Sequence, residues 1–152
     1  ELLFYISLFA VLCLAVINSM ISMTRAFRET TVQGELQQSG DILERMGREI
    51  RQAYGINSIS ASSLILNTTD RVGTNKTISF TLSGTNLVLS ENGGSVGNLN
   101  SPNIAVDALT FTEITTTKGK AVKIFMTVRS LHDNLNRTTD FYNTIVLRGD
   151  YE

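Results

Sequence analysis

Residues 1–24 read ELLFYISLFAVLCLAVINSMISMT, and after Glu1 no charged residue appears until Arg25. As a helix, about 23 uncharged residues span roughly 35 Å, which is enough to cross the hydrocarbon core of a bilayer. An ionised carboxylate next to such a segment costs a few kcal/mol and usually has a partner. The stretch therefore predicts a membrane-crossing helix that carries a carboxylate at its head.

A secretory signal peptide has a basic start, a short apolar core and a cleavage site of small residues. Residues 1–24 have no basic start, a longer apolar run and no Ala-x-Ala step. We therefore expect this helix to be retained in the mature protein. An open alternative is a single-pass anchor whose Glu1 carboxylate simply lies at the membrane interface.

Glu1-Leu2-Leu3, followed by an unbroken apolar helix, resembles the N-terminus of type IV pilins and pseudopilins. In that family prepilin peptidase cuts after a glycine and exposes a Phe-x-x-x-Glu start, so the four residues expected before Glu1 either lie outside this sequence or were removed. The resemblance implies that the carboxylate pairs with the N-terminal amine of a neighbouring subunit in a filament. It places the assembly interface at Glu1, Leu2, Leu3, Phe4, Tyr5, Leu8, Phe9 and Leu12.

Composition narrows the classes of function. The net charge is −1 and the basic residues are scattered, so no specific nucleic-acid binding is expected. Cys13 is the only cysteine and excludes an intrachain disulfide, although many pilins have one near the C-terminus. Many pilins also carry a proline in the first helix. Here the only proline is Pro102, so only the polar pair Asn18-Ser19 is available to loosen that helix.

The apolar helix is predicted to continue as an amphipathic helix over residues 25–54. One face carries acidic and basic side chains, and the other carries an apolar stripe at steps of three, four and seven. Gly55 is placed where a C-terminal cap is expected. Three glycines, at 34, 40 and 47, predict bends or close approaches of neighbouring helices. The helix–sheet core is expected to include Leu36, Leu43, Met46 and Ile50.

Beyond Gly55 the apolar pattern changes to a period of two, which predicts strands. A turn at residues 83–86 predicts a hairpin, and a change of apolar parity between Val106 and Leu109 predicts a bulge. Loops are expected at residues 91–103 and 132–140. The expected strands cover residues 77–82, 87–89, 104–114, 122–128 and 141–147.

These elements define an α+β protein with a pilin fold, in which a long N-terminal helix packs on an antiparallel sheet. Residues 1–24 form the membrane or filament-core helix. Residues 25–152 form the globular domain, made of the amphipathic helix 25–54 and the sheet 55–152. The stretches Val106 to Phe111 and Phe141 to Arg148 resemble parts of J-type minor pseudopilins and related pilus proteins.

Three groups of polar residues are candidates for a catalytic, metal or phosphate-binding site. His132 with Asp133 and a serine suggests a catalytic triad, but a solvated loop histidine is favoured. Asp133 and Asp140 suggest a calcium loop, yet two carboxylates without fixed spacing are a weak signal. Lys118, Lys120 and Lys123 are expected to be ordinary exposed charge. We therefore expect no catalytic, cofactor or metal site.

The expected function is a structural subunit of a type IV pilus or pilus-like filament. The resemblance implies that it starts in the bacterial inner membrane, in contact with lipid, and ends in an extracellular filament. Its expected partners are copies of itself or other pilins, prepilin peptidase and the pilus assembly machinery. The alternative is a membrane-anchored binding or adhesion domain that never polymerises, and an enzyme is the third possibility.

Overall fold

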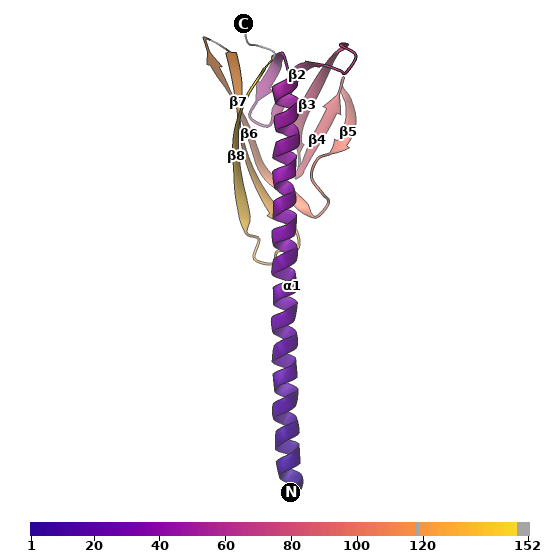
Figure 1. Ribbon diagram of the computed structural model, residues 1–152, viewed down its shortest axis with the longest axis vertical. Helices are drawn as coiled ribbons and strands as arrows, with labels where there is room; N and C mark the ends of the chain where they lie inside the picture. Colours follow the sequence, from indigo (N-terminus) through magenta and orange to yellow (C-terminus); the bar gives the residue numbers. More distant parts are fainter. Residues whose placement is uncertain (118, 149–152) are drawn as a thin grey trace.

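The structure is a computed structural model and describes residues 1–117 and 119–148. A single helix, α1 (Leu2–Gln52), runs unbroken through the apolar and the amphipathic stretches. Its 51 residues make it about 75 Å long. All β-strands gather around its C-terminal half, and its N-terminal half projects from the domain (Figure 1). The protein therefore has an α+β fold with one long N-terminal helix on antiparallel sheets.

The end of α1 differs from the prediction. Ala53 is the C-cap, and its backbone N–H donates to the carbonyls of Glu49 and Ile50. Because the Ala53 backbone is already extended, the chain enters the first strand at once, and Gly55 is a strand residue rather than a helix cap. Gly47 marks a close approach instead, since a Cβ there would lie 3.3 Å from the Ile145 Cδ1 atom.

The strands form two antiparallel sheets rather than one. Sheet one has five strands in sequential order, and sheet two has three. In Figure 1 the two sheets lie on either side of the helix. Sheet one comprises β1 (Gly55–Ser60), β2 (Ser63–Thr69), β3 (Asn75–Ser83), β4 (Asn86–Glu91) and β5 (Gly94–Asn98), and sheet two comprises β6 (Ile104–Thr116), β7 (Gly119–Ser130) and β8 (Thr138–Val146).

Strand β6 joins the two sheets. Its Val106 N–H donates to the carbonyl of Thr85 in the β3–β4 turn, and its Phe111 N–H donates to the carbonyl of Ala61 in the β1–β2 turn. The buried Asn100 side chain fixes the crossing point. Its Oδ1 accepts from the Leu87 N–H at 2.8 Å, and its Nδ2 donates to the Ile104 carbonyl at 2.6 Å. These bonds hold the sheets at a fixed angle around the helix.

The hydrophobic core lies between the helix and both sheets. Met46 and Ile50 are completely buried, Leu43 is buried, and Leu36 is only partly buried at the edge of the core. The helix therefore has the apolar face that the stripe predicted. From the sheets the core receives Leu64, Leu66, Ile78, Phe80, Leu87, Leu89, Ile104, Val106, Leu109, Phe111, Val122, Ile124, Met126, Val128, Ile145 and Leu147.

Some strand predictions are confirmed and others are wrong. The hairpin turn is confirmed by the pairing of Ser83 with Asn86, and the bulge by the register shift between Val106 and Ala108. Strands β1, β2 and β5 were missed, and β5 lies inside the predicted loop 91–103. The predicted loop 132–140 is shorter, because β8 already begins at Thr138.

Candidate functional site: the exposed half of the helix and its junction with the domain

The predicted assembly residues all lie on the part of α1 that projects from the domain. Glu1 is exposed, and the exposed fraction of the apolar members runs from 56% for Leu8 to 81% for Leu3. The first buried residue of the helix is Val32. Mean hydropathy reaches 2.3 over an 18-residue window, and no part of that window is buried. By length and composition this segment is suited to cross a membrane.

Two hydroxyl groups in the projecting half bond back to their own helix. Ser7 Oγ donates to the Phe4 carbonyl at 2.8 Å, and Thr24 Oγ1 donates to the Met20 carbonyl at 2.9 Å. A hydroxyl bonded back into its own helix costs little in an apolar environment. The helix continues unbroken through the polar pair Asn18-Ser19 in the single chain.

Glu1 is the N-cap of α1 but does not cap the helix with its side chain. Its backbone carbonyl accepts from the N–H groups of Phe4 and Tyr5, and its side chain is exposed. A carboxylate at this end interacts favourably with the helix dipole. The carboxylate is therefore free to meet a partner from another chain.

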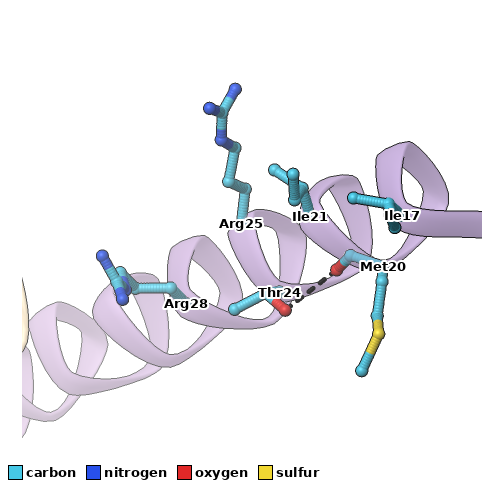
Figure 2. A pocket seen from close by; sticks show the side chains of 6 residues that line it. All are labelled: Ile17, Met20, Ile21, Thr24, Arg25 and Arg28. Carbon is cyan, nitrogen blue, oxygen red and sulfur yellow. Dashed lines mark hydrogen bonds between the residues drawn. The ribbon is translucent and has the colours of Figure 1, made fainter. Parts of the chain in front are cut away.

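The junction between the apolar run and the domain carries the first two cations. Arg25 and Arg28 line an open depression on the helix surface, and the Arg25 side chain extends away from the helix (Figure 2). Within residues 1–117 and 119–148, neither guanidinium group has an ion-pair or hydrogen-bond partner. The depression is lined by Ile17, Met20, Ile21, Thr24, Arg25 and Arg28.

An arginine of the β7–β8 loop ties the domain to the helix just above this junction. The two terminal nitrogens of Arg137 donate to the Glu29 carboxylate at 3.0 and 2.8 Å. Its Nε donates to Oδ2 of the buried Asp133 at 2.8 Å. A bidentate arginine–carboxylate pair fixes both distance and orientation. Arg137 therefore fixes the end of the β7–β8 loop to the helix at Glu29.

A second cluster, one and a half turns further along α1, centres on Glu35. Ser130 Oγ donates to Glu35 Oε2 at 2.5 Å, and His132 Nδ1 lies 2.7 Å from Glu35 Oε1. The sequence favours a solvated loop histidine for His132. The structure instead holds His132 against the helix. Because Ser130 and His132 both face Glu35, the serine is not paired with a base as in a catalytic triad. The cluster fastens the loop to the helix.

The two carboxylates of the suggested calcium loop each have other partners. Asp133 accepts from the Leu135 N–H and from Arg137, whereas Asp140 accepts from Thr127 Oγ1 at 2.7 Å. The part of the chain that the structure describes has no group of three His, Cys, Asp or Glu residues placed to hold a metal ion.

The predicted lysine cluster is described only in part. Lys118 lies outside the described residues. Lys120 pairs with Glu113, with its Nζ 3.1 Å from Oε1. Lys120 therefore already has an acidic partner within sheet two.

Comparisons with models of protein families, with curated proteins and with solved structures found no match to this chain.

The Asp133 anchor predicts a pH effect on stability. The hydrogen bond from Arg137 lowers the pKa of the Asp133 carboxyl from its ordinary value of 3.8 to about 2. Because the folded state then binds fewer protons, this stabilisation is present above pH 3.8 and is lost as the pH falls towards about 2. We expect the thermal unfolding midpoint in detergent to fall over this window. The fall is expected to be smaller in Asp133→Asn, and unchanged in the exposed control Asp41→Asn.

Proposed function

We propose that this chain is a structural subunit of a type IV pilus or a pilus-like filament. The observation that carries the proposal is the half of α1 that extends beyond the domain with its apolar side chains exposed. Burying one large apolar side chain is worth about 1.5–3 kcal/mol, so a surface of this size needs either lipid or other helices around it. In the proposed cycle, lipid surrounds this apolar surface before assembly, and copies of the same helix surround it afterwards.

The proposed mechanism is physical rather than catalytic. Before assembly, the apolar half of α1 lies in the bacterial inner membrane after processing by prepilin peptidase. The assembly machinery then transfers it into a bundle of copies of the same helix, or of other pilins, in an extracellular filament. Glu1 selects one stagger of the bundle, because a charge inside it is strongly penalised unless it meets a cation. The resemblance of residues 1–25 to pilins supports this role for Glu1.

The domain supports the proposal by leaving the projecting half free. The buried part of the helix begins at Val32, and Arg137 bonds to the helix at Glu29, one turn before it. Residues 1–28 are therefore available on all sides for packing with neighbouring helices. The domain would then lie on the outside of the filament.

Removal of residues 1–24 tests the proposal. The shortened chain keeps every core residue of the domain, and it loses the segment that is too apolar to remain in water alone. We expect a soluble, folded monomer by size-exclusion chromatography with light scattering, and no filaments by electron microscopy. Filaments from the shortened chain would show that the domain polymerises by itself, and the helix-bundle mechanism would be wrong.

A further inference from the structure

The loop between β7 and β8 is the part of the domain nearest to the projecting half of α1 (Figure 1). Arg137, at the end of this loop, is bonded to Glu29 on the helix. Two leucines of the loop have no apolar cover, since Leu131 is 55% exposed and Leu135 is 75% exposed. The domain therefore presents two exposed leucines on a loop that is tied to the helix at Glu35, through Ser130 and His132, and at Glu29, through Arg137.

If residues 2–24 cross the bilayer, Glu29 lies at the depth of the lipid headgroups. About 20 helical residues span the hydrocarbon core, and each headgroup layer adds about 5–7 Å. Glu29 lies four residues, or roughly 6 Å, beyond Arg25, where the uncharged run ends. The Arg137 end of the β7–β8 loop then lies in the headgroup layer rather than in bulk water.

The charges at this level favour an anionic surface. Arg25 and Arg28 precede Glu29 and Val32 by four residues, so they lie on the helix face that touches the domain one turn further along. The nearby carboxylates already have partners: the half-exposed Glu29 is paired with Arg137, while Asp133 and Glu35 are buried. Among the described residues, the guanidinium groups of Arg25 and Arg28 have no such partner.

We propose that Arg25, Arg28, Leu131 and Leu135 form a membrane-docking surface that seats the domain on anionic phospholipid before assembly. The inference rests on the membrane-anchored stage of the proposed function. The guanidinium groups donate to headgroup phosphates, and the two leucines enter the boundary between headgroups and acyl chains. Apolar and cationic side chains side by side are typical of protein surfaces that lie at this boundary. Assembly would have to break these contacts with phospholipid when it extracts the helix from the membrane.

Tryptophan fluorescence tests the docking surface in the full chain. The sequence has no tryptophan, so Leu135→Trp introduces a single reporter. The chain is reconstituted in vesicles of phosphatidylcholine and phosphatidylglycerol whose acyl chains carry bromine near the headgroup. We expect blue-shifted, strongly quenched emission from Leu135→Trp. We expect the quenching to be at least halved when Arg25→Gln and Arg28→Gln are added, or when phosphatidylglycerol is omitted.

Two further variants make the outcome unambiguous. Val72→Trp is the control, because Val72 is 88% exposed in the β2–β3 turn, beside Arg48 and Glu49 at the far end of α1. It is expected to stay unquenched. Leu12→Trp reports insertion of the helix and is expected to be quenched by bromine deep in the acyl chains.

Quenching at Leu12→Trp without quenching at Leu135→Trp would overturn the docking surface while leaving the anchor intact. The absence of both signals would overturn the docking surface together with the membrane stage of the proposed function. A blue shift at Leu135→Trp that appears only in assembled filaments would assign the surface to contacts between subunits, and would also overturn the proposal.

Discussion

Met46→Asp is expected to unfold the globular domain. Met46 is completely buried where α1 meets the two sheets, and no Lys, Arg or His is among the buried residues within 1–117 and 119–148. An unpaired buried charge costs about 3–5 kcal/mol, and the lost apolar contacts add to this cost. Because small domains have a total stability of about 5–15 kcal/mol, such a loss leaves little or no folded protein. The measurement is the near-ultraviolet circular dichroism and the unfolding midpoint of the purified chain.

Two controls separate charge from position. Gln38→Asp adds the same charge to the same helix at an exposed site, and is expected to shift the midpoint only slightly. Met46→Leu keeps the volume and the apolar character, and is expected to cost less than about 1.5 kcal/mol. A stable, cooperatively folded Met46→Asp domain would contradict the placement of this helix face in the core.

Glu1→Gln is expected to abolish filament assembly while leaving the domain folded and the helix in the membrane. If the carboxylate meets a cation of a neighbouring subunit, the amide can still hydrogen-bond but cannot neutralise it. An ammonium group left unpaired in an apolar bundle costs several kcal/mol per subunit. The assay compares the filament yield with the membrane-bound pool of the same cells.

Glu1→Asp is the matched control for Glu1→Gln, because it keeps the charge and shortens the reach. We expect an intermediate filament yield. Normal filaments from Glu1→Gln would show that Glu1 lies at the membrane interface without a partner. That outcome would favour the anchored binding domain over the filament subunit.

The helix was the most predictable part of the fold. An apolar run followed by a stripe at helical spacing indicates one continuous helix, and the structure has it over Leu2–Gln52. The end was misplaced because Gly55 was interpreted as a cap, whereas the chain becomes extended at Ala53 in order to pair with β2. Local sequence does not report that pairing, since the Asn67 carbonyl that receives the Tyr54 N–H is supplied by the sheet.

The missed strands lack a clean alternation. In β2, Leu64, Ile65 and Leu66 are consecutive apolar residues, and only the sheet determines that Ile65 is the one not fully buried. Strand β5 is short, rich in glycine and wholly exposed, so its composition resembles that of a loop. Its strand character comes from pairing with β4, which is a tertiary effect.

The bonds between the helix and the β7–β8 loop could not be predicted from local sequence either. Glu35 lies 95 residues from Ser130 and 97 from His132, and Arg137 lies 108 residues from Glu29. One signal was present, because Glu35 falls between Val32 and Ser39 on the buried side of the helix. A carboxylate at such a position requires hydrogen-bond donors from elsewhere in the chain.

Electron cryomicroscopy of filaments sheared from cells that express the full chain is the most direct test of the central claim. We predict filaments in which the segment Leu2–Thr24 of each subunit is packed against the same segment of its neighbours around the axis, with the sheets outside. The account would be contradicted if cells held the folded chain in the membrane and formed no filaments containing it. It would equally be contradicted by filaments whose subunits touch only through the β-sheets.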